Sequence, residues 1–151
     1  MKVVYISGPF VGDGTKKSIE QNIQRAKEYA TVLANKKIGI FCPHLYNLDL
    51  DEKDLTKRQR YFYDLDGELL VRSDAVVVLP DWEKSFGARH EIKIAEELKL
   101  PIFYPKSVSD LDEVEKWYFS DDAKENTGTG TNSDKVTDIR SAMSRYMFKA
   151  V

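Results

Sequence analysis

Glu91 is an acidic residue at a position where the helical pattern favours an apolar one. Residues 86–98 have the spacing of one buried helical face, and its members are Ala88, Glu91, Ile92, Ala95 and Leu98. A carboxylate turned toward a core costs several kcal/mol unless it is ion-paired or hydrogen-bonded. The sequence leaves two interpretations of Glu91, a structural partner of an arginine or an acid held in place for chemistry.

A second acidic residue, Asp66, interrupts another apolar stripe. The buried side of a helix predicted over residues 55–72 is formed by Phe62, Asp66, Leu69 and Leu70. Gly67 follows Asp66 directly, and glycine inside a helix costs about 1 kcal/mol relative to alanine, which indicates a close approach of backbone or ligand. Asp66 is either a functional acid or a structural one that caps a loop or pairs with Arg72.

Strand and helix signals alternate along the chain. Strands are predicted over residues 2–7, 38–42, 75–79 and 100–104, and helices over residues 18–35, 55–72, 86–98 and 110–119. The first of these helices starts with a capping-box pattern at Ser18. Parallel neighbours need crossover connections, which are right-handed. The predicted fold class is α/β, a flavodoxin- or Rossmann-like parallel sheet of four to five strands with helices on both faces.

Ligands of such sheets bind at the carboxyl ends of the strands. The loops at those ends cover residues 8–15, 43–47 and 80–87. The first loop begins Gly8-Pro9-Phe10 but has neither the Walker spacing nor G-x-G-x-x-G, which disfavours the ordinary nucleotide hydrolases and dehydrogenases. Ser85 precedes Gly87 at the predicted start of a helix, where free N–H groups favour an anion and where a serine also serves as a cap.

Composition excludes several function classes. The chain has 151 residues and a formal charge of −2, so it lacks the basic surface of a nucleic-acid binder, and no apolar run approaches the roughly 20 residues that span a bilayer. Cys42 is the single cysteine, and with no signal-peptide pattern we expect a cytoplasmic protein. His44 and His90 are too isolated to form a metal pair, so we predict neither a metal site nor a cofactor.

The chain changes character after residue 119. Residues 120–135 contain almost no apolar side chains and are predicted to be a flexible linker. Residues 136–151 are predicted to contain an amphipathic helix with Val136, Ile139, Met143, Tyr146 and Met147 on one side. We divide the chain into an α/β domain over residues 1–119, the linker, and this C-terminal helix, which we expect to dock on its own domain or on a partner subunit.

Four segments in this order resemble the nucleoside 2-deoxyribosyltransferase-like superfamily. They are Tyr5-Ile6-Ser7-Gly8-Pro9, Tyr63-x-x-Asp66, Ser73-Asp74-Ala75-Val76-Val77-Val78 and Ser85-x-Gly87-x-x-x-Glu91. The resemblance covers residues 1–104 and leaves the tail unmatched. The superfamily includes nucleoside deoxyribosyltransferases and nucleoside 5′-monophosphate N-glycosidases.

The resemblance implies a role for each matching residue. Glu91 matches the nucleophile that attacks the anomeric carbon, Tyr5 matches the tyrosine that hydrogen-bonds it, and Asp66 matches the acid that contacts or protonates the base. Ser85 matches a position that binds the 5′-phosphate in the glycosidases. The glycosidases commonly place Ser and Arg in the first loop, where this chain has Pro9 and Val11, and Lys16 or Lys17 would have to compensate. The expected substrate-binding residues are Gly8, Pro9, Phe10, His44, Ser85 and Gly87.

Breaking an N-glycosidic bond suits two acids with different tasks. A carboxylate captures the developing sugar cation, and a protonated acid supplies the leaving base with its proton. We expect burial and a neighbouring charge to raise the pKa of Asp66, whereas Glu91 near a helix amino end is favoured as an anion.

The predicted function is hydrolysis of the N-glycosidic bond of a (deoxy)nucleoside 5′-monophosphate through a glycosyl-Glu91 intermediate. Residues 1–119 are predicted to be the nucleotide-binding catalytic domain. One alternative is a 2-deoxyribosyltransferase that exchanges bases between deoxynucleosides, and another is a non-catalytic nucleotide-binding or sensor protein. The expected partner is a small nucleotide or nucleoside, with no nucleic-acid polymer and no membrane. The resemblance also implies a homodimer or higher homo-oligomer.

Overall fold

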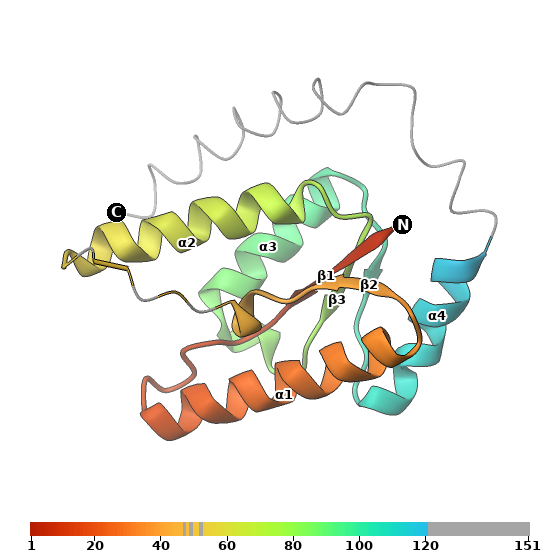
Figure 1. The fold of residues 1–151 in the computed structure, drawn as a ribbon, viewed down its shortest axis with the longest axis horizontal. Coiled ribbons are helices and arrows are strands. Elements are labelled where there is room, and N and C mark those ends of the chain that lie inside the picture. The colour runs from red at the N-terminus through yellow and green to blue at the C-terminus, as the bar shows by residue number, and fades with distance from the viewer. Residues whose placement is uncertain (47, 49, 52, 121–151) are drawn as a thin grey trace. The chain divides into compact units, whose positions relative to one another are not determined.

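The computed structural model describes residues 1–46, 48, 50, 51 and 53–120. Its four strands form one parallel sheet in the order β2-β1-β3-β4 (Figure 1). The strands are β1 (Val3–Ser7), β2 (Gly39–Phe41), β3 (Ala75–Val78) and β4 (Ile102–Phe103). The helices are α1 (Lys16–Asn35), α2 (Leu55–Leu70), α3 (Phe86–Glu97) and α4 (Asp112–Phe119). Short 3-10 turns are η1 (Pro43–Leu45), η2 (Trp82–Lys84) and η3 (Val108–Leu111). The predicted α/β fold is confirmed.

The strand order places a topological switch point between β1 and β3. Tyr5 of β1 pairs with Val76 of β3, and Ser7 pairs with Val78, while Val3 pairs with Gly39 of β2 on the other side. The chain leaves β1 toward β2 and leaves β3 toward β4, so the connections diverge between β1 and β3. The carboxyl ends of strands at such a switch point are where open α/β sheets bind ligands.

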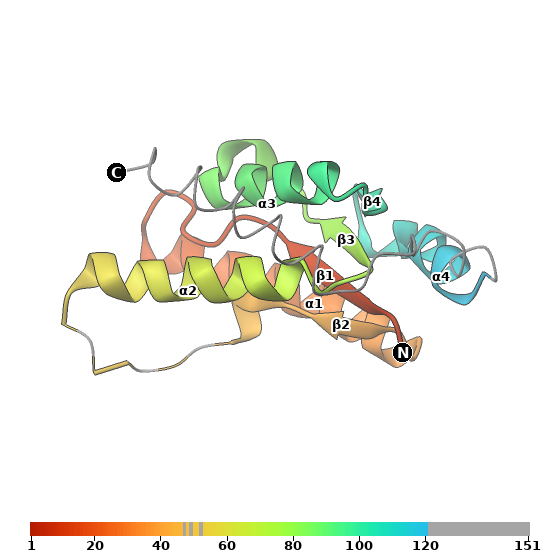
Figure 2. The same ribbon diagram turned by 90° about the horizontal axis from the view of Figure 1, so that it is seen from above.

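Helices cover the two faces of the sheet separately. In Figure 1, α1 lies below the strands and α2 above them, and Figure 2 shows α2 and α3 side by side with α1 behind the strands. This arrangement follows from right-handed crossovers, because the connection from β1 to β2 runs in the opposite direction along the sheet to the two later ones.

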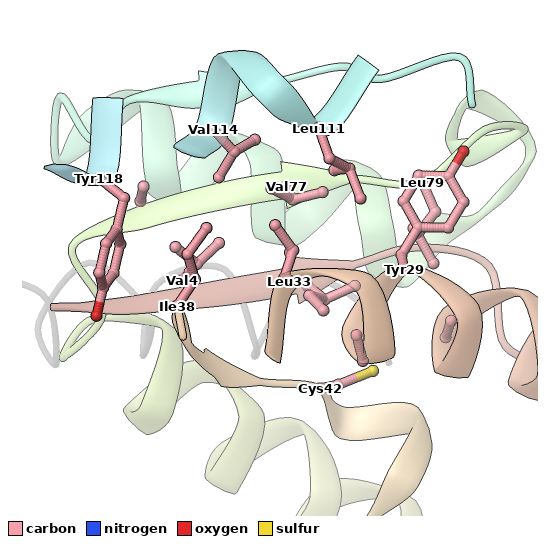
Figure 3. Packing of buried hydrophobic residues seen from close by; sticks show 14 residues of the cluster. Val4, Tyr29, Leu33, Ile38, Cys42, Val77, Leu79, Leu111, Val114 and Tyr118 are labelled. Atoms are coloured by element: carbon pink, nitrogen blue, oxygen red, sulfur yellow. The ribbon is translucent and has the colours of Figure 1, made fainter. Parts of the chain in front are cut away.

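The larger hydrophobic core lies on the face of α1 and α4 (Figure 3). Its buried members are Val4, Ile6, Ala26, Tyr29, Ala30, Leu33, Ile38, Cys42, Ala75, Val77, Leu79, Leu111, Val114 and Tyr118. Val4 and Ile6 alternate along β1 with Tyr5 and Ser7, which must therefore point to the opposite face. That second face holds the polar side chains described below.

The start of α1 differs from the prediction. The capping box predicted at Ser18 is wrong, because the helix begins at Lys16 with Thr15 as its cap, and the Thr15 hydroxyl accepts from the Ser18 backbone N–H at 3.2 Å. The Ser18 hydroxyl instead accepts from the backbone N–H of Asp13 at 3.3 Å. Serine is the somewhat better cap by type, so the turn formed by the first loop, and not the residue type, places the cap at Thr15.

The predicted linker over residues 120–135 and the predicted helix over residues 136–151 lie, except for Ser120, outside the described residues. No helix among the described residues is both long and apolar enough to cross a lipid bilayer.

Candidate active site

Glu91 lies in the second turn of α3 and reaches across to β1. The Tyr5 hydroxyl donates to Glu91 Oε1 at 2.8 Å, and the Ser7 hydroxyl donates to Glu91 Oε2 at 2.5 Å. Tyr5 and Ser7 are 0% and 1% exposed. The carboxylate is therefore held by two hydroxyl groups from one strand, and the arginine partner considered for Glu91 is not among its hydrogen-bonding groups in the described part of the chain.

Burial dominates the ionisation of Glu91. It raises the pKa of the carboxyl group to about 7, and nearby Asp66 raises it further, while the bonds from Ser7 and Tyr5 lower it. The expectation that the helix amino end would favour the anion is wrong, because the helix-dipole effect falls off within the first turn and Glu91 lies beyond it. Burial and the Glu91 charge raise the pKa of Tyr5 well above its ordinary value, so Tyr5 remains a hydrogen-bond donor.

Asp66 lies on α2, close enough for its charge to act on Tyr5 and Glu91. Burial raises the pKa of its carboxyl group to about 6, and its charge raises the pKa values of both Tyr5 and Glu91. No hydrogen bond to its carboxylate comes from any described residue. Arg72, its suggested structural partner, pairs with Glu68 one turn earlier in the chain. Asp66 is consequently a partly buried acid that protonates at mildly acidic pH.

The first loop is held in place by neighbouring elements. A Cβ atom on Gly8 would lie 2.8 Å from Leu79, so only glycine allows the ends of β1 and β3 to approach this closely. The His44 Nε2 atom of η1 lies 2.9 Å from the Pro9 carbonyl oxygen, and because a carbonyl only accepts, Nε2 carries the proton. Phe10 is 46% exposed, and its ring centroid lies 5.8 Å from that of His44.

His44 is therefore a supporting residue in this structure as well as a predicted substrate-binding one. It is 7% exposed, and burial lowers the pKa of its imidazole. Its Nδ1 atom lies 3.9 Å from the Cys42 sulfur. Burial raises the pKa of Cys42 to about 11, which leaves an unreactive thiol of the kind expected for a core cysteine. Among the described residues, no group of three or more His, Cys, Asp or Glu side chains is placed to hold a metal ion.

Ser85 caps α3 as predicted. Its hydroxyl accepts from the Ala88 backbone N–H at 3.2 Å and can still donate one hydrogen bond of its own. A Cβ atom on Gly87 would lie 3.8 Å from the Tyr63 ring of α2, an ordinary contact, so this neighbour does not require a glycine. The cap and an anion-binding role are compatible, and the latter stays a prediction. Lys16, one suggested source of compensating charge, is 90% exposed and pairs with Glu20.

The structure brings the predicted catalytic residues together and places Ser7 beside them. Tyr5, Asp66 and Glu91 come from β1, α2 and α3 and interact electrostatically, whereas Ser7 was not predicted as a site residue. A signal for Ser7 existed in the sequence. Residues two apart on a strand share a face, so any hydroxyl at position 7 lies beside the side chain at position 5.

Comparison with known proteins identifies the family of this chain. Residues 2–105 match the family described as Domain of unknown function (DUF7768). The chain belongs to this family. The matched segment contains every candidate site residue from Tyr5 to Glu91. A search of curated proteins found no match.

A solved structure extends the comparison to the fold. The chain is similar to a 2-deoxyribosyltransferase from the psychrotolerant bacterium Bacillus psychrosaccharolyticus, with 16% sequence identity and a TM-score of 0.55. The match covers 78% of this chain and 93% of that one. At this identity the likeness establishes a shared fold.

Proposed function

We propose that this protein hydrolyses the N-glycosidic bond of a (deoxy)nucleoside 5′-monophosphate, with Glu91 as the nucleophile. One observation carries the proposal, namely that the half-buried Glu91 carboxylate accepts from Tyr5 and Ser7 at the carboxyl end of β1. A half-buried acid held by hydroxyl groups at the switch point of an α/β sheet is unnecessary for packing. Such a carboxylate is suited to capturing a sugar cation.

The proposed reaction has two steps. A Glu91 carboxylate oxygen forms a bond to the anomeric carbon as the bond from that carbon to the base nitrogen breaks. The electron pair leaves with the base, which takes a proton from Asp66. Water then attacks the anomeric carbon, Asp66 takes up a proton, and Glu91 leaves as a carboxylate. The products are the free base and the sugar phosphate.

The pKa values define when both acids are in the required state. Glu91 must be deprotonated, which is favoured above about pH 7, and Asp66 must be protonated, which is favoured below about pH 6. The competent form is then a minority that is most populated between these values. We expect a narrow bell-shaped rate profile with its maximum between pH 6 and 7.

A second candidate function is transfer of 2-deoxyribose between bases. The likeness to a 2-deoxyribosyltransferase structure favours it, and the first step would be identical. Only the acceptor differs, because a second base nitrogen replaces water in resolving the ester. A protein that binds the nucleotide without turnover is the third outcome, and it predicts that no base is released.

The experiment that tests these functions measures base release from a panel of nucleosides and nucleoside 5′-monophosphates, with and without a second free base. Base release alone supports hydrolysis, and a new nucleoside supports transfer. Acid quenching followed by peptide mass spectrometry should find the sugar on the peptide that contains Glu91. An adduct on another residue would contradict the proposed mechanism.

Ser85→Ala tests the phosphate assignment in the same assay. If the Ser85 hydroxyl donates to the 5′-phosphate, its loss should raise KM for monophosphates by about 10- to 100-fold and leave nucleosides nearly unchanged. Ser85→Thr keeps both the hydroxyl and the helix cap and is the matched control. Equal losses for nucleosides and monophosphates would show that Ser85 acts only as the cap of α3.

A further inference from the structure

The Glu91 carboxylate is bonded on both of its oxygens by donors from a single strand. Tyr5 donates to Oε1 and Ser7 donates to Oε2. An ionised carboxylate has two lone pairs on each oxygen, so one remains free on each atom after these bonds form. These lone pairs are available to a reacting group.

The strand that supplies these donors is one of the two inner strands of the sheet. β1 pairs with β2 along one edge and with β3 along the other. Beyond the pairing of Ser7 with Val78, the Leu79 backbone N–H donates to the Ser7 carbonyl oxygen at 2.8 Å. Ser7 is 1% exposed. The sheet therefore holds the Ser7 backbone, and with it the hydroxyl group, in a fixed position. A donor on a loop would not hold a carboxylate in one orientation.

We propose that Ser7 is a positioning residue, which fixes the plane of the Glu91 carboxylate so that a free lone pair points at the anomeric carbon of the substrate. This inference rests on the proposed function of Glu91 as the nucleophile. One bond from Tyr5 alone would leave the carboxylate free to rotate about it. The second bond from Ser7 removes that rotation, and placing a reacting atom correctly contributes strongly to rate.

Ser7 also favours the ionised form of Glu91. The charge of Asp66 on α2 raises the pKa of Glu91, and the charge of Glu91 in turn raises the pKa values of Tyr5 on β1 and of Cys42 after β2. Tyr5 and Cys42 both have raised pKa values and stay neutral near pH 7, so Asp66 is the only one of the three that changes charge there. A hydroxyl donor to a carboxylate lowers its pKa. Loss of Ser7 should then raise the pKa of Glu91.

The test compares Ser7→Ala with Ser73→Ala in the full-length protein. Ser73 is also a buried serine, but its hydroxyl donates to the Leu69 backbone carbonyl at 2.9 Å and not to a carboxylate. In Ser7→Ala, kcat should fall by about 10- to 100-fold with KM changed less than about 3-fold. Because Glu91 has the higher of the two pKa values, the basic limb of the kcat/KM profile should move to higher pH by about one unit. Ser73→Ala should keep the wild-type kcat and profile.

Ser7→Cys provides a graded variant. A thiol fits a similar volume and is a weak hydrogen-bond donor, so kcat and the basic limb should fall between those of the wild type and Ser7→Ala. Carbon-13 NMR titration of the glutamate carboxyl carbons, with Glu91 assigned by its loss in Glu91→Gln, measures the same pKa without substrate. The Glu91 pKa should rise by about one unit in Ser7→Ala and remain unchanged in Ser73→Ala.

The outcomes separate this inference from the proposed function. If the wild type releases base and Ser7→Ala has the same kcat and the same basic limb, Ser7 has no positioning role and the inference is overturned. If the wild type releases no base from any substrate, the proposed function is wrong and the positioning role falls with it. The NMR titration would in that case still establish whether Ser7 bonds the carboxylate.

Discussion

The two faces of the sheet use the same strand for opposite purposes. Along β1, Val4 and Ile6 enter the apolar cluster beneath α1 and α4, while Tyr5 and Ser7 point toward α3 and hold Glu91. All four side chains are 0–1% exposed. Burial alone does not distinguish the faces, whereas the chemistry of what is buried does.

This difference separates stability from function within one domain. On the α1 face, burying each large aliphatic side chain contributes about 1.5–3 kcal/mol and requires no partner beyond close packing. On the α2 and α3 face, a buried carboxyl group opposes folding when ionised, because burial raises the pKa of Glu91 to about 7. The polar face is maintained at a cost in stability, which is typical of a functional site.

The comparison predicts its largest effect at Glu91. Glu91→Gln keeps the size of the side chain and removes the charge, so the variant should fold and bind substrate but lose at least about 1,000-fold in kcat. Glu96→Gln, an exposed change on the same helix, is the matched control and should retain activity. Wild-type turnover by Glu91→Gln would show that the face of α2 and α3 does not carry the chemistry through Glu91.

The opposite face should respond in stability and not in turnover. Leu33 is 0% exposed in the cluster beneath α1, so Leu33→Ala should lower the free energy of unfolding by about 2–5 kcal/mol. Its kcat, corrected for the folded fraction, should stay within about 3-fold of the wild type. Denaturant unfolding and base release measured on the same sample check both expectations. A large loss of kcat in the folded fraction would mean that the faces are coupled.

The smallest predicted effect is a gain in stability of Glu91→Gln over the wild type, which grows as pH rises. Glu91 has a folded-state pKa raised from 4.5 to about 7, so the folded state binds its proton more tightly than the unfolded chain does. The free energy of unfolding should then decrease as pH rises from 4.5 to 7 and level off above that. Glu91→Gln removes this dependence and should be more stable than the wild type by about 1–2 kcal/mol at pH 8.

Unfolding curves recorded at pH 5 and pH 8 test this sign. The stability difference between Glu91→Gln and the wild type should be larger at pH 8 than at pH 5. The same comparison for Glu96→Gln should show no such increase, because Glu96 is exposed. A difference that shrank with rising pH would indicate that the ionised Glu91 carboxylate is stabilising in the folded state.

The sequence by itself determined the alternating elements and the two anomalous acids. Helical spacing placed Glu91 and Asp66 on inward stripes, since a periodicity of 3.6 residues is a local property of the chain. The strand predicted over residues 75–79 rests on an equally local run of β-branched residues, and the four residues of β3 are all buried in the structure. These features need no knowledge of distant contacts.

Only the tertiary structure decided which groups meet the Glu91 carboxylate. Ser7 and Glu91 are 84 positions apart, and their bond depends on how α3 packs on β1. The raised pKa of Glu91 has the same origin, because desolvation depends on what surrounds the group and not on its place in a helix. His44 likewise became a support for Pro9 only when η1 was placed beside the first loop. Local patterns specify which side chains point inward, and packing specifies which groups those side chains contact.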